Sequence, residues 1–269
     1  MLKAHIIASG SKGNATVVET DAGALLIDCG ITKKALTAGL QDVGCPLSKI
    51  SHVLITHEHT DHVKGFGVNM RHFAKTLGAE NLPTLVTFQG TYEASRELQD
   101  PKVPLNHIFP APEETIACSS FHVTLLPSSH DAASPANILV EVDEGGAGDS
   151  LALITDTGFV TEPVMRCCRN AGILALEANH DPRMLKEGPY PYPVKQRIAS
   201  KDGHLSNQQA TDAARALCGL RTRAIAAMHV SENNNTYDMA FDAVAQGAQE
   251  SLGSPMVYHA YQHMTTSIL

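Results

Sequence analysis

The chain of 269 residues is 43% hydrophobic and 18% charged, which is typical of a globular protein of one or two domains with enough apolar material for a core. Its formal net charge of −8 disfavours the broad basic face with which proteins coat nucleic acid, although a local contact with phosphate stays open. No apolar run approaches the ~20 residues of a membrane span, so we expect no membrane contact. Because the N-terminus lacks a signal-peptide pattern and the six cysteines form no Cys-x-x-Cys pair, we expect a cytoplasmic protein with reduced thiols.

The first half of the chain predicts alternating strands and helices. Short runs rich in β-branched residues, each bounded by Gly, Asp or Ser, predict strands at Ala4–Ala8, Ala15–Glu19, Ala24–Asp28, His52–Thr56 and Thr84–Phe88. Residues 9–14 form a turn of small residues between the first two strands. Helical spacing of apolar residues predicts helices at Thr32–Val43, at about 63–77 and at Thr91–Leu98, and glycines follow the first two of them.

The second half predicts more strands and then further helices. Strands are expected at Thr115–Cys118, Phe121–Leu126, Asn137–Val142, Leu151–Thr155, Ile173–Glu177, Ala224–His229 and Met256–His259. Helices are expected at Thr161–Asn170, Ser206–Leu217 and Tyr237–Glu250, a surface loop at Asp143–Asp149 and a proline-rich bend at Pro189–Pro193. This order predicts one α/β domain over residues 1–269, in which two sheets pack face to face with helices outside.

A dense metal-binding pattern follows the apolar run Val53–Ile55. The segment reads Thr-His57-Glu-His59-Thr-Asp61-His62. Imidazole and carboxylate groups suit zinc, manganese or iron. Since side chains two residues apart share a face of an extended segment, His57 and His59 can bind one ion while Asp61 and His62 serve a second. These four side chains cannot surround two ions, so we expect further ligands elsewhere in the chain.

Three isolated residues complete the ligand set. His130, Asp156 and His229 each follow a predicted strand, where a rigid element can hold a ligand and a loop can expose it. Each would be weak evidence alone. Taken together, they predict one site of His57, His59 and His130, a second site of Asp61, His62 and His229, and Asp156 as a bridge between the two.

The order of these motifs resembles the five-motif signature of the metallo-β-lactamase superfamily. The resemblance implies a four-layer αββα sandwich, two divalent ions at one edge of the sheets, and a metal-bound hydroxide as nucleophile. The nitrogen and oxygen ligands admit zinc or manganese, with iron also open. The resemblance places Asp61 among the catalytic residues as well as the ligands. Antibiotic-hydrolysing members typically carry a cysteine where this chain has Asp156, and the aspartate resembles the dinuclear thioesterases and phosphodiesterases.

Two further segments resemble motifs of ribonuclease Z. Residues 176–181 contain Glu177, and residues 203–207 contain His204 at the start of a predicted helix. The resemblance implies a proton relay in which His204 protonates the departing oxygen and Glu177 orients the imidazole of His204. The alternatives are that His204 is an exposed loop residue and Glu177 a surface carboxylate. His180 is either another site residue or a structural partner of Asp181.

Candidate substrate contacts surround this relay: Arg197, Ser206, Asn207, Ser231, Asn233 and His180. Cations also outnumber acids here, since Arg183, Lys186, Lys195, Arg197 and Lys201 face only Asp181, Glu187 and Asp202. The cluster is either a rim that guides phosphate or an ordinary solvated helix face. Ser206 is also a natural N-cap, and Asn233 can cap the following helix.

More narrowly, the chain resembles the YycJ-like (WalJ-like) branch of the superfamily. The matching segments are residues 9–14, 176–181, 195–198, 203–207 and 229–234. That branch implies a 5′→3′ exonuclease on DNA and a link to DNA repair. The interval from Asp156 to His229 already holds predicted helices and strands, so it has no room for another domain of ~50 residues, and nucleases of the β-CASP type are excluded.

We therefore predict a dinuclear phosphodiesterase that removes nucleotides from a DNA or RNA end. The alternatives are a phosphodiesterase for small cyclic or alkyl phosphodiesters, a thioester hydrolase of the glyoxalase type, and a non-catalytic metal or ligand sensor. The sequence leaves the identity of the metal and the oligomeric state open.

Overall fold

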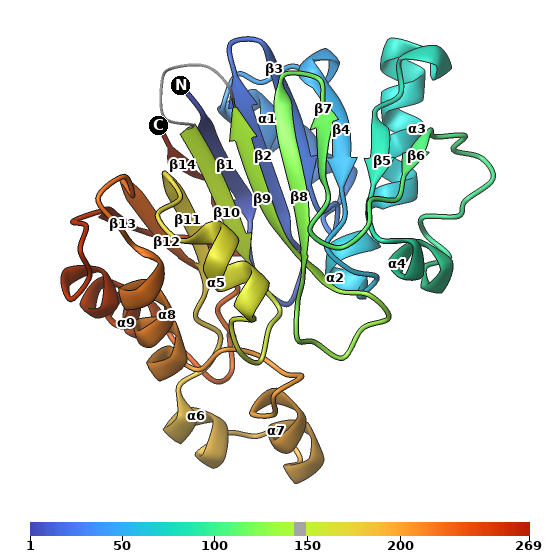
Figure 1. The fold of residues 1–269 in the computed structure, drawn as a ribbon. Coiled ribbons are helices and arrows are strands. Elements are labelled where there is room, and N and C mark those ends of the chain that lie inside the picture. The colour runs from blue at the N-terminus through green and yellow to red at the C-terminus, as the bar shows by residue number, and fades with distance from the viewer. Residues whose placement is uncertain (143–148) are drawn as a thin grey trace.

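The structure, a computed structural model, describes residues 1–142 and 149–269. Two seven-stranded sheets face each other (Figure 1). The first has the order β14 (Thr266–Ile268), β1 (Lys3–Ala8), β2 (Ala15–Thr20), β3 (Gly23–Ile27), β4 (Ile50–Leu54), β5 (Thr84–Val86), β6 (His107–Ile108). The second has the order β13 (Met256–His259), β12 (Ala224–Met228), β11 (Ile173–Glu177), β10 (Asp149–Ile154), β9 (Ala136–Val142), β8 (Phe121–Pro127), β7 (Thr115–Cys118).

Helices cover the outer face of each sheet. Against the first sheet pack α1 (Lys33–Asp42) and α3 (Phe66–Leu77), and against the second pack α5 (Glu162–Cys168), α8 (Asn207–Leu217) and α9 (Tyr237–Gln249). The shorter helices are α2 (Thr60–Val63), α4 (Gln89–Ala94), α6 (Pro182–Glu187) and α7 (Tyr192–Ile198), with 3₁₀ turns at Leu47–Lys49 and Ala79–Asn81. This arrangement confirms the predicted four-layer αββα sandwich.

The alternation of side chains along the strands explains the layers. In β3, Leu25 and Ile27 point into the core between the sheets, while Ala24 and Leu26 point to the helices outside. Because both faces of this strand are buried, its sequence is a continuous apolar run without a polar face. The two sheets therefore share one inner core, and each has a second core under its own helices.

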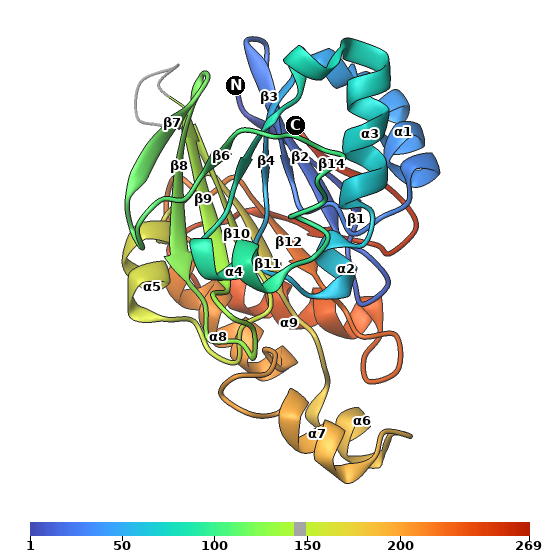
Figure 2. The same cartoon turned by 90° about the vertical axis from the view of Figure 1, so that its right-hand side faces the viewer.

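Strand direction brings several loops to one edge of the sandwich. In the first sheet β3, β4, β5 and β6 are parallel, and in the second β10, β11, β12 and β13 are parallel. Strand β8 also runs parallel to β10, because both pair antiparallel with β9. The loops that follow these strands lie at the lower end in Figure 1, and α6 and α7 project beyond this edge in both views (Figures 1 and 2).

The structure differs from the sequence prediction at short elements. The prediction of a proline-rich bend at Pro189–Pro193 is wrong for its last two residues, because α7 begins at Tyr192. Proline is compatible with the first turn of a helix, where its missing N–H has no partner to lose, and Pro182 likewise opens α6. The helix predicted at Thr91–Leu98 is found at Gln89–Ala94, and β6 and β14 were not predicted.

Other boundaries shift by smaller amounts. The strand expected at His52–Thr56 lies at Ile50–Leu54, and the helix expected at about 63–77 is divided into α2 and α3. Of the loop predicted at Asp143–Asp149, residues 143–148 lie outside the described part of the chain, and Asp149 begins β10. Among the described residues, no helix is long and apolar enough to cross a membrane.

Candidate metal centre and proton relay

The predicted ligands all lie at the edge where parallel strands end. β4 leads into the segment with His57 and His59, and α2 then carries Asp61 and His62. His130, Asp156 and His229 follow β8, β10 and β12. Residues far apart in the sequence thus meet because their strands run in the same direction.

The first group of donors consists of His57, His59 and His130. One ring nitrogen of each lies within 4.8 Å of the other two. Nδ1 of His130 is 2.9 Å from the carbonyl oxygen of Gly203, to which it donates, so Nε2 is left as the free ligand atom. Nε2 of His130 lies 3.2 Å from Nδ1 of His59. Two basic nitrogens at this distance are suited to share one cation.

An unpaired buried nitrogen tests whether a cation fits this group. His57 is only 1% exposed, and its Nε2 has no hydrogen-bond partner among the described residues. A buried polar atom without a partner is costly, and native structures usually satisfy it with a protein group, water or an ion. Nδ1 of the same ring is 3.1 Å from Oγ1 of Thr56, which leaves Nε2 for the cluster. The residues present therefore fit a metal ion.

The second group consists of Asp61, His62 and His229, with donor atoms again within 4.8 Å of one another. Oδ2 of Asp61 lies 3.3 Å from Nε2 of His62 and 3.5 Å from Nε2 of His229. Asp156 lies between the two groups, with Oδ2 3.3 Å from Nε2 of His62 and Oδ1 3.7 Å from Nε2 of His130. This position suits the bridging carboxylate that the sequence predicted.

Charges in this cluster favour a cation over an empty site. Burial opposes ionisation of Asp156, but the imidazoles of His229 and His62 hold the pKa of that carboxyl well below its usual range. Burial likewise opposes charge on His62, yet Asp28, Asp61 and Asp156 raise its pKa well above the ordinary value. The carboxylates thus attract protons to the cluster, and a divalent cation would replace those protons.

Two contacts behind the ligands were not predicted. Asp28, which follows β3, lies 2.8 Å from Nδ1 of His62 through Oδ2, and its Oδ1 accepts the backbone N–H of Thr56 at 2.9 Å. Asn14 donates its amide to Oδ2 of Asp61 at 3.2 Å. A carboxylate that holds the far nitrogen of a ligand histidine fixes its tautomer and orientation. The signal in the sequence was that Asp28 ends a strand, as Asp156 does.

Backbone conformation marks three of these residues. Asp28, Asp156 and His229 have φ values of 59°, 50° and 53°. The left-handed region is uncommon for residues other than glycine and costs of order 1–3 kcal/mol each, so it persists only where the surroundings enforce it. All three residues end strands at the candidate site, which is consistent with strain held for function.

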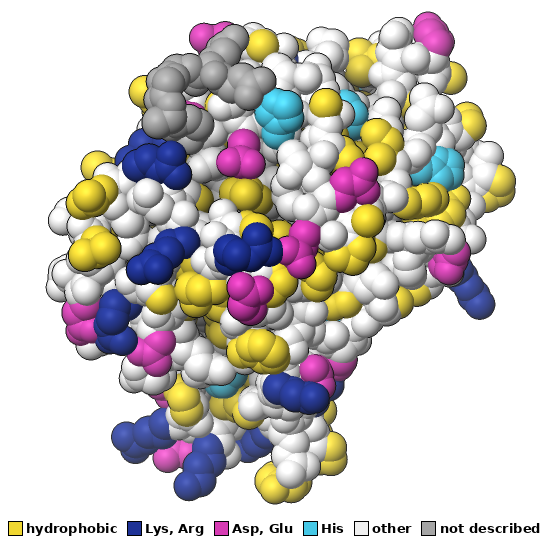
Figure 3. Space-filling view, viewed as in Figure 1, with side chains coloured by type: hydrophobic (Ala, Val, Ile, Leu, Met, Phe, Trp, Pro, Cys, Tyr) yellow, Lys and Arg dark blue, Asp and Glu magenta, His cyan; other side chains and the backbone are white. Residues whose placement is uncertain are grey.

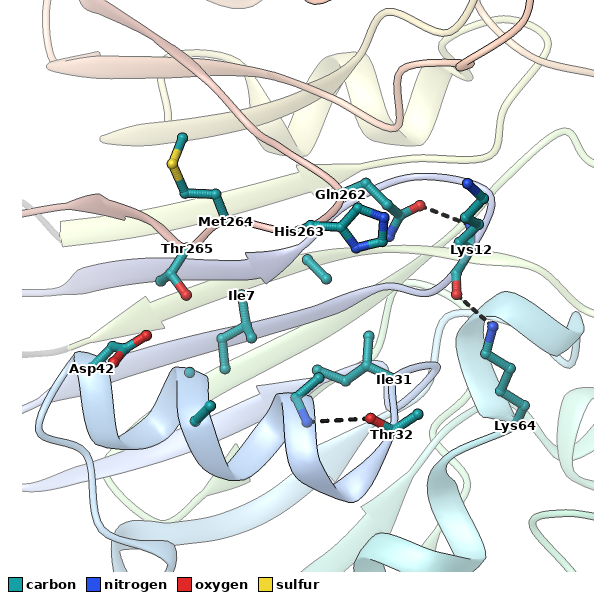
Figure 4. Close-up of a pocket in the computed structure, with 14 residues that line it drawn as sticks. Ile7, Lys12, Ile31, Thr32, Asp42, Lys64, Gln262, His263, Met264 and Thr265 are labelled. Carbon is teal, nitrogen blue, oxygen red and sulfur yellow. Dashed lines mark hydrogen bonds between the residues drawn. The ribbon is translucent and has the colours of Figure 1, made fainter.

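The turn at residues 9–14 supports the second group from behind. Oγ of Ser9 accepts the backbone N–H of His229 at 2.7 Å. Gln262, from the segment before β14, accepts the backbone N–H of Lys12 at 2.8 Å and donates to the carbonyl of Gly13 at 2.8 Å. Figure 4 shows the Gln262 contact at the rim of a cavity of about 520 Å³ between α1 and the C-terminal segment. The segment with Gln262 thus holds the turn whose Ser9 contacts His229.

The predicted relay is formed by Glu177 and His204. Oε1 of Glu177 lies 2.8 Å from Nδ1 of His204 and 2.9 Å from Nδ1 of His229. Oε2 accepts the backbone N–H groups of Thr157 and Leu205, each at 3.1 Å. Because Glu177 is 0% exposed, the alternative of a surface carboxylate is wrong. The side chain of His204 is 19% exposed, so it reaches solvent from the inner wall of the site.

The two relay groups keep each other charged. Burial opposes ionisation of Glu177, but His204 and His229 lower the pKa of its carboxyl to about 2. Burial also opposes protonation of His204, yet Glu177 and Asp156 raise its pKa above the usual value. The arrangement therefore places a proton on a partly exposed imidazole beside the candidate metal ligands.

Several candidate substrate residues have partners within the protein. The hydroxyl of Ser206 caps α8 by accepting the N–H of Gln209 at 3.3 Å. Asn207 and Asn235 form a reciprocal amide pair at 3.0 and 2.8 Å, and Asn207 is buried. These contacts hold the loop of His204 in place.

The candidates after His229 are also engaged. Oγ of Ser231 accepts the backbone N–H of Asn234 at 3.3 Å, and Asn233 donates to the hydroxyl of Tyr190 at 2.9 Å. Asn233 lies before the Thr236 N-cap of α9 and does not cap that helix itself.

Arg197 and His180 are placed differently. Arg197 is exposed and forms a double hydrogen bond with Asp131, the residue after the candidate ligand His130, and one of the two contacts is 3.0 Å. His180 is 3% exposed, and its Nδ1 has no partner among the residues described. The side chain of Asp181, the alternative partner considered for His180, caps α6 by accepting the N–H of Met184 at 2.8 Å.

Comparisons with known proteins identify the family and the fold of this chain. A family model described as a β-lactamase superfamily domain matches residues 24–230. Exodeoxyribonuclease WalJ of Streptococcus pneumoniae is 35% identical over 260 residues, 96% of this chain and 93% of that protein. Exodeoxyribonuclease YycJ of Bacillus anthracis is 33% identical over 246 residues, 91% of this chain and 88% of that protein. The metallo-β-lactamase fold protein YhfI of Bacillus subtilis superposes with a TM-score of 0.72 over 99% of both chains at 17% identity, which shows the fold alone.

Proposed function

Because the chain belongs to the β-lactamase superfamily and has the metallo-β-lactamase fold, we propose that it is a metal-dependent phosphodiesterase that acts as a 5′→3′ exonuclease on DNA. Residues 1–269 would act as one catalytic domain, since the site needs strand ends from both sheets. The names of the two relatives above support the class of substrate. The free state of all six cysteines supports a cytoplasmic location.

We propose that the two donor groups hold two divalent ions, zinc or manganese, with iron also compatible. His57, His59 and His130 would hold one ion, Asp61, His62 and His229 the other, and Asp156 would contact both. When bound, such ions supply an acidified water and positive charge for the phosphoryl oxygens. The unpaired Nε2 of His57 supports this assignment independently of any relative.

In the proposed reaction, His204 protonates the departing oxygen. Its Nδ1 is committed to Glu177 at 2.8 Å, so Nε2 remains to carry the proton to the substrate. Glu177 keeps that imidazole oriented and protonated. Because the same carboxylate contacts Nδ1 of His229 at 2.9 Å, it would position the acid relative to the metal ligands.

The hydrogen bond between Glu177 and His204 is the observation that carries the proposal. A thiolate leaves without a proton, whereas the alkoxide of an unactivated phosphodiester benefits from an acid. The pair thus favours a phosphodiesterase over a thioester hydrolase of the glyoxalase type. It equally suits small cyclic or alkyl phosphodiesters, which remain the second candidate. A sensor would need no acid beside its ions.

Arg197 is the proposed phosphate contact at the rim. Its bonds to Asp131 use only part of the five N–H donors of a guanidinium, so it can still meet a phosphate oxygen. Ser206, Asn207, Ser231 and Asn233 would then act by holding the loops that carry His204 and His229.

One panel of substrates tests the proposal. Metal content is measured first, and release of nucleotides is then followed from 5′-labelled and 3′-labelled single- and double-stranded DNA and RNA, with and without chelator. A cyclic nucleotide and a lactoyl thioester serve as comparison substrates. We expect chelator-sensitive release of the 5′ label from DNA. Turnover confined to the cyclic nucleotide or to the thioester would support the corresponding alternative, and metal binding without any turnover would support a sensor.

A further inference from the structure

A cavity of about 340 Å³ lies between α6 and α7, beyond the candidate metal centre. His180, Leu185 and Tyr192 are among the residues that line it, together with Lys186 and Lys195. Its volume falls at the lower end of the range for small-molecule pockets. Aromatic and apolar walls beside cations suit a planar organic group that carries an anion.

The His180 wall of this cavity is attached to the proton relay. His180 follows Glu177 by three residues, which span at most about 10 Å of extended chain. A parallel β-bridge pairs His180 with Ser206, two residues after His204. A substrate with a phosphate at the relay can therefore place a neighbouring group in the cavity.

His180 has one unpaired ring nitrogen in this wall. It is 3% exposed, and no described residue forms a hydrogen bond with its Nδ1. Burial lowers the pKa of its imidazole to about 4, so the ring is neutral near pH 7. A neutral imidazole can donate to or accept from the edge of a nucleobase. Because the ring of His180 lines the cavity, it can meet a ligand that has its own hydrogen-bonding atoms.

Tyr192 is an exposed aromatic residue that lines the cavity. It is 71% exposed, and its hydroxyl accepts the side-chain amide of Gln196, one turn along α7, at 3.0 Å. An exposed aromatic ring of this kind is a typical stacking platform for bases of single-stranded nucleic acid.

Cations accompany this ring. Lys186 is exposed, and Nζ of Lys195 donates to the carbonyl of Lys186 at 2.7 Å, which holds the two residues together. The nearby Glu187 is paired with Arg183 at 3.2 Å, so it does not cancel the charge of the lysines. Figure 3 shows Lys and Arg side chains gathered at this end of the molecule, over α6 and α7.

We propose that this cavity is a base-binding subsite, in which one nucleobase of the substrate strand stacks on Tyr192, meets His180 at its edge, and has its flanking phosphate near Lys186 and Lys195. The inference rests on the proposed function and extends it, because it assigns α6 and α7 to recognition of a nucleotide and not of a bare phosphodiester.

Binding of two small ligands tests the subsite. Deoxyadenosine 5′-monophosphate and deoxyribose 5-phosphate carry the same phosphate and differ by the base. With manganese present, we expect calorimetry to give about tenfold tighter binding of the nucleotide to the natural protein, in the range that one base–aromatic stack supplies. Tyr192→Ala should remove most of this difference, and Tyr192→Phe should keep it. His180→Phe, which fills the wall without ring nitrogens, should weaken binding of the nucleotide alone.

Leu220→Ala is the control, because Leu220 is 86% exposed in the loop before β12, at the opposite end of that strand from His229. Equal affinity of the natural protein for the two ligands, or a base preference that survives Tyr192→Ala, would overturn the subsite. Nuclease activity without a base preference would refute the subsite and leave the proposed function standing. A base preference in a protein that cuts no nucleic acid would refute the exonuclease and leave a nucleotide-binding pocket.

Discussion

Nδ1 of His204 and Oε1 of Glu177 lie 2.8 Å apart, and the carboxylate is completely buried while the imidazole reaches solvent. The pair comes from the ends of β11 and of the loop before α8, 27 residues apart. The same oxygen also contacts Nδ1 of His229, and Oε2 accepts the backbone N–H groups of Thr157 and Leu205. The charge of Glu177 is thus held in a fixed place, and only His204 faces the substrate.

Replacing His204 should separate substrates by their leaving groups. His204→Ala removes the proposed acid, so we expect kcat on DNA to fall by about 10²–10⁴-fold. A p-nitrophenyl phosphodiester, whose leaving group departs without a proton, should lose much less. Steady-state rates on both substrates, at equal metal content, measure the ratio. Equal losses would count against acid catalysis by this residue.

Neutralising Glu177 should shift the alkaline limb of the pH profile. The Glu177 carboxylate raises the pKa of His204, and an acid must be protonated, so the rate falls as pH rises through that pKa. Glu177→Gln removes the charge and keeps a hydrogen-bond acceptor, so the limb should move to lower pH. Profiles of kcat measure this. Glu162→Gln, with a side chain that is 79% exposed, should leave the limb in place; an unmoved limb in Glu177→Gln would contradict the relay.

Metal should stabilise the fold through Asp156. A ligand that binds only the folded state at 100 times its Kd adds about 2.7 kcal/mol to the free energy of unfolding. We expect zinc or manganese to raise the Tm of chelator-treated protein, and Asp156→Ala to lose that rise together with activity. Each variant is compared with its own metal-free Tm, and His263→Ala, exposed and outside the cluster, is the control. Full turnover by a folded, metal-depleted Asp156→Ala protein would defeat the metal assignment.

Replacing Asn207 should lower the free energy of unfolding. Its side chain exchanges two hydrogen bonds with Asn235, which also donates to the carbonyl of Ala178 at 2.9 Å. Asn207→Ala leaves a buried amide partly unpaired, so we expect a loss of about 1–3 kcal/mol in the free energy of unfolding. Urea unfolding of both single variants and the double variant measures the coupling, expected at about 0.5–3 kcal/mol. Additive losses would show that the amide pair contributes nothing of its own.

Prediction from sequence succeeded where one residue pattern implied one geometry. The segment from His57 to His62 predicts a metal site because few other arrangements use so many imidazoles together, and long apolar runs such as that of β3 predict buried strands. Prediction from sequence failed where the same residues are compatible with several local structures. The prolines at Pro189–Pro193 are compatible with a bend or with the first turn of a helix. Only the tertiary packing decides that a helix, α7, begins at Tyr192.

The sequence by itself determined the types of the candidate ligands and the class of fold, because donor chemistry and the spacing of apolar residues are local properties. The tertiary structure decided which groups share a partner. Parallel strand ends bring Asp28 behind His62, and they place Glu177 between His204 and His229. The same packing directs the amide of Asn207 inward to Asn235 and leaves Nδ1 of His180 without a hydrogen-bond partner among the described residues. These contacts join residues distant in the chain, so no local pattern could specify them, and the pairing of Glu177 with His204 was expected only from the resemblance to ribonuclease Z.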